Sequence, residues 1–129
     1  MKKTIFAFLF ILAWVNSSFA QEYVSPTYKE WVTKSADYME QNKLDSAEYA
    51  LNQALISDPK NKNNSWLMTS LSTIQQHLGK FDAAYISITS ALNKHPESAY
   101  MLHQRAGLLL EMDRLDEARE DYNKLLSID

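Results

Sequence analysis

AEYALNQALISDP, at residues 47–59, is the first of three stretches that share one pattern; AYISITSALNKHP follows at residues 84–96 and AREDYNKLLSID at residues 118–129. In each stretch an alanine is followed four positions later by a larger apolar residue, and three positions after that by a further small or apolar one. That spacing places all three on one face of a helix. The triplets are Ala47-Leu51-Ala54, Ala84-Ile88-Ala91 and Ala118-Tyr122-Leu125. Because the pattern recurs at a nearly constant period, the sequence predicts stacked helical repeats.

A second helix is predicted in front of each of these stretches. Its apolar positions are Trp31, Tyr38 and Met39 in the first repeat, Leu67, Leu71 and Ile74 in the second, and Leu102, Ala106 and Leu109 in the third. Short breaks at Asn42-Lys43, Gly79-Lys80 and Asp113-Arg114 separate the two helices. Pro59 and Pro96 end the first two units, because the residue before a proline is disfavoured in helical geometry. The expected fold is all-α, with six helices in three hairpins.

In these residues the sequence resembles the tetratricopeptide repeat family, whose unit is a 34-residue helix–turn–helix. The favoured positions are held by Trp31, Ser35, Tyr38, Ala47, Leu51 and Ala54 in the first unit, Leu71, Ser72, Gly79, Ala84, Ile88 and Ala91 in the second, and Ala106, Leu109, Ala118 and Tyr122 in the third. The resemblance implies an α-solenoid, in which small residues allow close helix approach and larger ones fill the spaces between layers. One departure is Gln75, which replaces an aromatic residue and is expected to loosen the packing there.

The expected domain boundaries follow from this repeat. Repeat 1 covers residues 28–61, repeat 2 covers residues 65–98, and repeat 3 covers residues 99–129 and stops before a closing proline. The spacing of 37 between the two closing prolines places a three-residue loop insertion at residues 62–64. Residues 21–27 form an N-terminal lead-in.

Residues 1–20 are interpreted as a secretory signal peptide of bacterial type. Lys2 and Lys3 precede an uncharged apolar run at residues 5–15, and Ser18-Phe19-Ala20 provides a cleavage site that leaves Gln21 at the new N-terminus. The alternative is a retained membrane anchor, although the run is short against the roughly 20 residues that span a bilayer. The protein is therefore expected to be exported, to the periplasm or outside the cell, with no stable membrane span after cleavage.

Charge and composition exclude several classes of function. Loss of the two leader lysines leaves 11 basic against 16 acidic residues, a net charge of −5. This acidity argues against nucleic-acid binding, which depends on lysine and arginine contacts to phosphate. Cysteine is absent, which excludes thiol catalysis and cysteine metal sites.

No pattern of catalytic or cofactor-binding residues is found. The three histidines, His77, His95 and His103, have no helical metal-ligand spacing, and the two glycines cannot form a phosphate-binding loop. Several carboxylates near the C-terminus are interpreted as a solvated acidic face: Asp113, Asp116, Glu117, Glu120 and Asp121. We expect no metal, no cofactor and no enzymatic activity.

The resemblance implies that the first helices of the repeats line a groove that binds a protein or peptide. The residues carried over to that groove are Val32, Met39, Trp66, Thr69, Thr73, His77, Tyr100 and His103. Trp66 and Tyr100 are candidate anchors, since aromatic residues dominate binding hot spots; Trp66 could equally pack against the preceding loop or hairpin. A clamp for carboxylate-ended peptides would need charged or amide groups at positions held here by Val32, Ala36, Ser70, Tyr100 and Gln104, and the resemblance therefore disfavours that specialised function.

The last predicted helix carries Leu115, Tyr122, Leu125 and Ile128 on one side, with no polar capping helix after it. Terminal repeats need such a cap for solubility. Either the chain is the N-terminal piece of a longer protein, or this helix packs against a partner or a second copy. Two hypotheses follow: an exported scaffold that binds a peptide or protein, and a structural or self-associating segment of a longer cell-envelope protein.

Overall fold

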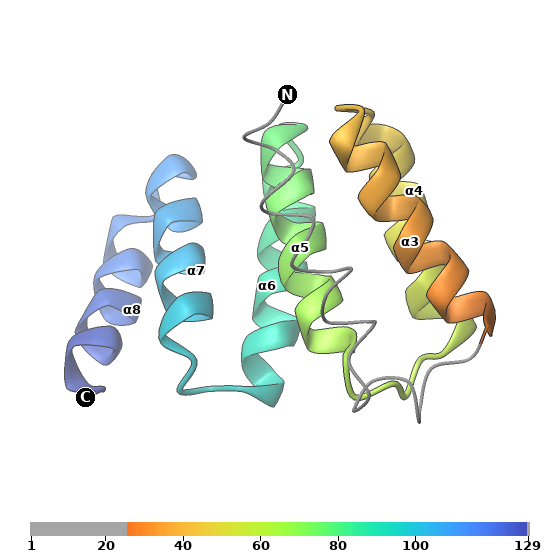
Figure 1. Ribbon diagram of the computed structural model, residues 1–129. Helices are drawn as coiled ribbons and strands as arrows, with labels where there is room; N and C mark the ends of the chain where they lie inside the picture. Colours follow the sequence, from red (N-terminus) through yellow and green to blue (C-terminus); the bar gives the residue numbers. More distant parts are fainter. Residues whose placement is uncertain (1–25, 129) are drawn as a thin grey trace. The chain divides into compact units, whose positions relative to one another are not determined.

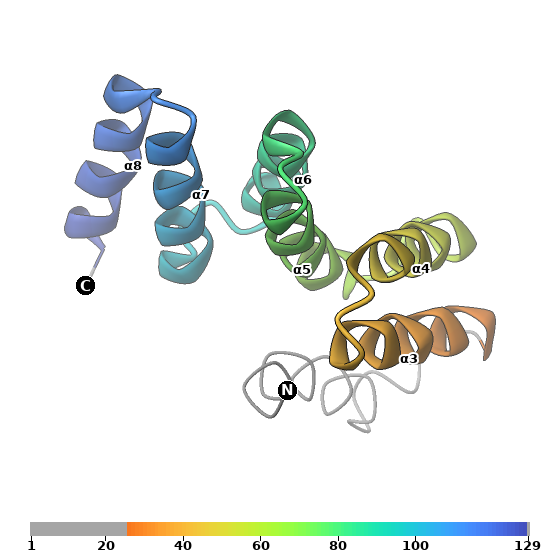
Figure 2. The ribbon, with the colours of Figure 1, turned by 90° about the horizontal axis from the view of Figure 1, so that it is seen from above.

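The computed structural model of the chain describes residues 26–128, which contain six α-helices and no β-strand (Figure 1). The helices are α3 (Pro26–Glu40), α4 (Leu44–Ser57), α5 (Asn64–His77), α6 (Phe81–Lys94), α7 (Ala99–Glu111) and α8 (Leu115–Ser127). Consecutive helices pair as the antiparallel hairpins α3–α4, α5–α6 and α7–α8, which Figure 2 shows from above. The all-α prediction with six helices is confirmed.

The helix boundaries differ slightly from those expected. Helix α3 begins at Pro26, inside the predicted lead-in, and α5 begins at Asn64, which was predicted to be the last residue of the loop insertion. The predicted signal peptide and most of the lead-in lie outside the described residues. Within residues 26–128, no helix has both the length and the apolar character needed to cross a bilayer.

Each hairpin turns at a residue in the left-handed region of backbone space. These residues are Asn42 with φ of 58°, Gly79 with φ of 76° and Asp113 with φ of 58°. The amide of the next residue then bonds back to a carbonyl five positions earlier, as in Lys43 to Tyr38 at 2.8 Å, Lys80 to Gln75 at 2.8 Å and Arg114 to Leu109 at 2.9 Å. This is the Schellman ending of a helix, which glycine and asparagine favour because they tolerate positive φ. The three turns therefore have the same backbone geometry.

The chain forms two compact units, residues 26–67 and 68–128 of the described part. In the first unit Val32 and Met39 of α3 and Ala47, Leu51 and Ala54 of α4 are all inaccessible to solvent. The alanines have little side-chain volume, so the two helix backbones can approach closely.

A hydrogen-bonded loop after α4 completes the first unit. The buried Tyr28 hydroxyl donates to Asn64 Oδ1 at 2.9 Å, and Asn64 Nδ2 donates to the Asp58 carbonyl at 2.9 Å. Asn61 Nδ2 also donates to Asp58 Oδ2 at 3.0 Å. Burial, reinforced by the negative charge of Asp58, raises the pKa of Tyr28 well above its usual range. The polar stretch that the sequence marks as a loop is therefore an ordered structure tied to the start of α3.

In the second unit, buried serines join α5 to α6. Ser72 Oγ donates to the Ala84 carbonyl at 2.8 Å, and Ser87 Oγ donates to Gln75 Oε1 at 2.7 Å. The expectation that Gln75 loosens the packing is not supported by this geometry, because its side chain is buried and its amide oxygen accepts a hydrogen bond. A buried polar group with a partner avoids the desolvation penalty of an unpaired one.

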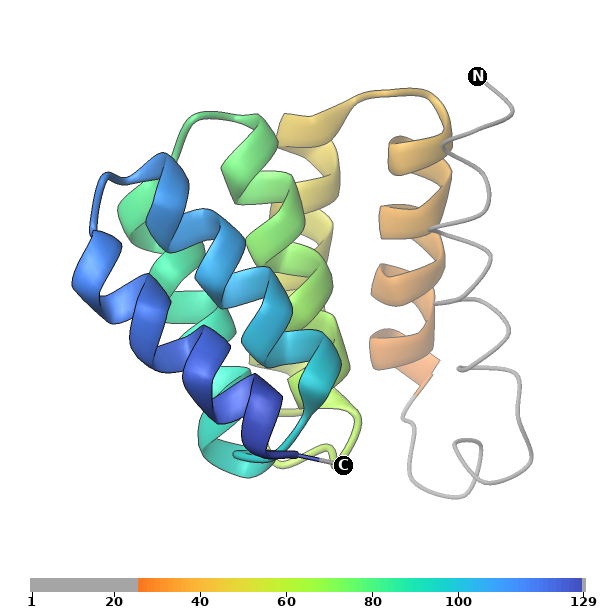
Figure 3. The same ribbon diagram turned by 90° about the vertical axis from the view of Figure 1, so that its left-hand side faces the viewer.

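A buried ion pair joins α7 to α8, which lie side by side in Figures 2 and 3. Arg105 donates from Nε and Nη2 to the two carboxylate oxygens of Asp121, both at 2.7 Å, and from Nη1 to Thr89 Oγ1 on α6 at 3.3 Å. Asp121 was predicted to belong to a solvated acidic face, and this is wrong for that residue: only 8% of its side chain is exposed. The error arises because its partner is sixteen positions away, on another helix.

The remaining acidic residues of α8 stay near the surface. Glu117 pairs with Arg114 at 2.6 Å, and Asp116 lies 3.6 Å from Arg119. The guanidinium of Arg114 also lies over the ring of Tyr85, 4.3 Å from its centre. Pairs this exposed contribute little to stability.

Candidate functional site

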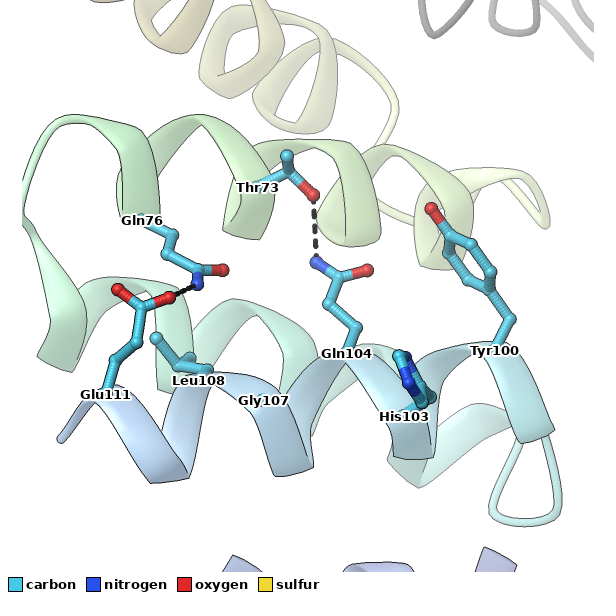
Figure 4. Close-up of a pocket in the computed structure, with 8 residues that line it drawn as sticks. All are labelled: Thr73, Gln76, Tyr100, His103, Gln104, Gly107, Leu108 and Glu111. Carbon is cyan, nitrogen blue, oxygen red and sulfur yellow. Dashed lines mark hydrogen bonds between the residues drawn. The ribbon is translucent and has the colours of Figure 1, made fainter. Parts of the chain in front are cut away.

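An open pocket of about 330 Å³ lies in the second unit, between α5 and α7 (Figure 4). Its lining residues are Thr73, Gln76, Tyr100, His103, Gln104, Gly107, Leu108 and Glu111. Thr73 and Gln76 come from α5, and the other six come from two adjacent rows of α7, spaced by four residues. Residues four apart on a helix share one face, so both helices present a continuous edge to the pocket.

The floor of the pocket is formed by a bridge between the two helices. Gln104 Nε2 donates to the Thr69 carbonyl at 3.1 Å and to Thr73 Oγ1 at 2.9 Å. Both amide protons of Gln104 are thereby used. Its Oε1 is buried and has no hydrogen-bond partner among the described residues. A buried acceptor without a partner is unfavourable by about 1–3 kcal/mol.

One end of the pocket carries a negative charge. Gln76 Nε2 donates to Glu111 Oε1, as the dashed line in Figure 4 shows. This hydrogen bond positions the carboxylate at the C-terminal end of α7. Glu111 forms no ion pair with any residue in the described part of the chain. Its charge is therefore available to a ligand.

The opposite end is aromatic. Tyr100 lies in the first turn of α7 and is 63% exposed, and its ring extends toward α5 in Figure 4. His103, one turn further along, packs edge-on against Tyr122 of α8, with ring centres 6.3 Å apart. The pocket thus has an exposed aromatic side chain at one end and a carboxylate at the other.

The residues carried over by the resemblance have different positions in the structure. Thr73, Tyr100 and His103 line the pocket, and Thr69 is buried but contributes its carbonyl to the bridge. His77 is exposed near the end of α5, where its Nδ1 donates to the Thr73 carbonyl at 2.8 Å.

The remaining three of the eight expected groove residues, Val32, Met39 and Trp66, belong to the first unit. Val32 and Met39 are fully buried there, so neither presents a surface to a ligand in this structure, and Trp66 is half-buried at the start of α5. Gln104 was considered only as a position of the carboxylate clamp, and Leu108 was not predicted as a groove residue. The spacing of four from Tyr100 through Gln104 to Leu108 would have identified them as members of one helical face.

No group of three or more histidine, aspartate or glutamate side chains in residues 26–128 is placed to hold a metal ion.

Comparison with known proteins supports the fold. A tetratricopeptide repeat protein from Parabacteroides merdae has a similar crystal structure, with a TM-score of 0.78 and 40% sequence identity over 79% of this chain. A mutant of MamA is similar with a TM-score of 0.71 and 24% identity over 81% of this chain, a likeness of fold alone. This chain spans 40% of the first of these proteins and 74% of the second. No protein-family model and no curated protein matches the sequence.

The fold class is thus the all-α, tetratricopeptide-like one that the sequence predicts. Folds of this class present concave surfaces made by successive helices, and such surfaces bind other proteins. The structural neighbours therefore support a tetratricopeptide-like repeat fold for this chain.

Proposed function

We propose that this protein is an exported scaffold that binds a peptide, or an extended segment of a protein partner, in the α5–α7 pocket. The observation that carries the proposal is the open pocket itself, with an exposed tyrosine at one end and a carboxylate without an ion-pair partner in the described residues at the other. Polar groups of this kind fix the orientation of a ligand, and the aromatic ring supplies contact area. Nucleic acid is not part of the proposal, because the pocket lining has no lysine or arginine.

Site-specific photo-crosslinking tests this function. A photoreactive phenylalanine derivative replaces Tyr100 in one variant and Ile86 in the other, and the full chain is produced in bacterial cells with its own leader. Ile86 is the matched control, since it is 68% exposed in the same unit but lies on α6 and not in the pocket lining. We expect a defined crosslinked partner from position 100 only. Equal crosslinking from both positions, or none from position 100, would refute the pocket as the binding site.

Export is tested in the same cells. Fractionation should place the protein outside the cytoplasm, and mass spectrometry should find Gln21 at its N-terminus. An intact Met1 on the exported protein would contradict cleavage and favour a retained anchor.

A second candidate function is self-association through α8, as a structural segment of a longer cell-envelope protein. Leu115 is 53% exposed and Leu126 is 82% exposed on this helix. Tyr122, Leu125 and Ile128, which the sequence places on the apolar side, are only half-buried. Light scattering decides between these functions: a concentration-independent monomer would exclude a homodimer through α8, and a dimer abolished by Leu126→Glu would support it.

A further inference from the structure

We propose that the α5–α7 pocket selects an extended peptide carrying a lysine or arginine side chain, which pairs with Glu111 while a second, apolar residue of the peptide contacts Tyr100. This inference rests on the proposed function and specifies its ligand. The alternative ligands, acidic or purely apolar peptides, are outcomes of the test below.

The pocket lining carries a negative charge and no fixed positive charge. Among the eight lining residues Glu111 alone has a fixed charge, and none of the eight is lysine or arginine. The arginines of this unit are engaged elsewhere, Arg105 with Asp121, Arg114 with Glu117 and Arg119 with Asp116. Glu111 itself has no ion pair within the described residues, so a basic ligand is electrostatically complementary to the pocket.

The Glu111 carboxylate is also held in place. The hydrogen bond from Gln76 Nε2 occupies Oε1, which leaves Oε2 for a donor from the ligand. An amide donor does not neutralise a carboxylate, so the negative charge persists. A carboxylate fixed by a neighbour loses less side-chain freedom when it binds a cation than a mobile surface carboxylate does.

The spacing of the two ends sets the length of the ligand. Tyr100 and Glu111 are eleven positions apart on α7, or about 17 Å at the rise of an α-helix. An extended peptide covers about 3.3 Å per residue. The peptide residue that contacts Tyr100 and the peptide residue that pairs with Glu111 are therefore about five positions apart.

The test begins with selection of seven-residue peptides from a random array against the full chain. The best binder is then titrated in solution, together with versions in which each basic residue is replaced by norleucine or by glutamate. Isotope-labelled protein locates the binding site, through the amide signals of Thr73 and Gly107 in the pocket. We expect a lysine or arginine about five residues from an apolar residue, and about fivefold weaker binding of the norleucine version, with a further loss for glutamate.

Two protein variants test whether Glu111 causes the preference for basic peptides. Glu111→Gln keeps a side-chain oxygen that can accept from Gln76 and removes the charge, so the preference for lysine over norleucine should disappear. Glu120→Gln removes an exposed charge of α8 outside the pocket and should leave the preference unchanged. A preference that survives Glu111→Gln overturns the inference.

The results also separate this inference from the proposed function. If peptides shift the pocket signals but acidic or uncharged ones bind as well as basic ones, the inference fails and the proposed function stands. If the selected peptides leave the pocket signals unmoved, both fail.

Discussion

Arg105→Met is expected to reduce the free energy of unfolding by about 3 kcal/mol. This is a larger loss than the one expected when its ion-pair partner, Asp121, is replaced by leucine. The substitution removes two charge-assisted hydrogen bonds of 2.7 Å and leaves the Asp121 carboxylate without a partner in a site where only 8% of the side chain is exposed. Aspartate is too short to reach water from there. Breaking a buried pair in this way is destabilising by about 3–5 kcal/mol; the lower end applies because 21% of the Arg105 side chain is exposed.

Asp121→Leu should be destabilising by only about 1.5–2 kcal/mol. The guanidinium remains charged when its partner is lost, because arginine is not deprotonated in proteins. Its long side chain can move toward solvent, which limits the penalty. In the double variant, Arg105→Met with Asp121→Leu, both polar groups are gone. Its stability should lie within about 1 kcal/mol of the unsubstituted protein, because apolar replacement of a buried pair is often nearly neutral.

Urea unfolding followed by circular dichroism at 222 nm measures all four proteins of this cycle. For Arg105→Met the expected change corresponds to a fall in melting temperature of about 10 °C. The reasoning is refuted if the two single variants lose equal and small amounts, below about 0.5 kcal/mol, or if the double variant loses the sum of the two. The first result would mean that the pair behaves as an exposed surface bridge.

Three further predictions concern stability. Gly79→Ala should be destabilising by about 1–2 kcal/mol, because φ is +76° and no atom lies within 4 Å of the added Cβ, so the whole effect comes from the backbone; Asn42→Gly, at the equivalent turn, should shift the urea midpoint the other way. Tyr28→Phe should be destabilising by about 1 kcal/mol at pH 7 through loss of the bond to Asn64. Because folding raises the pKa of Tyr28, the native protein should also lose stability as the pH rises above about 10, where the unfolded tyrosine ionises, and the Phe variant should lose less. Ala84→Leu should overpack a fully buried site and reduce the free energy of unfolding by about 1–3 kcal/mol. Thermal unfolding measures this change, and an unchanged melting temperature would contradict the packing described.

Much of the fold could be predicted from the sequence because its determinants are local. The Ala47-Leu51-Ala54 spacing defines a helical face within eight residues, and a positive-φ residue such as Gly79 marks a turn by its own backbone preference. The start of α5 was misplaced by one residue, since the asparagine-rich loop is ordered by a hydrogen bond from Tyr28, 36 positions away.

The candidate site was predicted only in part. Thr73, Tyr100 and His103 line the pocket as members of the expected helices. Val32 and Met39 occupy corresponding repeat positions in the first unit, yet both are fully buried. A repeat position specifies which side of its own helix a residue occupies; whether that side is open depends on what the rest of the chain packs against it.

The sequence by itself determined the six helices, their pairing into hairpins and the turns between them, because these depend on side-chain periodicity and backbone preference over fewer than 40 residues. Only the tertiary structure decided which polar groups of different helices meet. Gln76 reaches Glu111, Gln104 reaches Thr73, and the guanidinium of one helix makes Asp121 a buried partner instead of a surface charge. The physical reason is that hydrogen bonds and ion pairs act over about 3 Å, so they depend on how the hairpins pack and not on the spacing of residues along the chain.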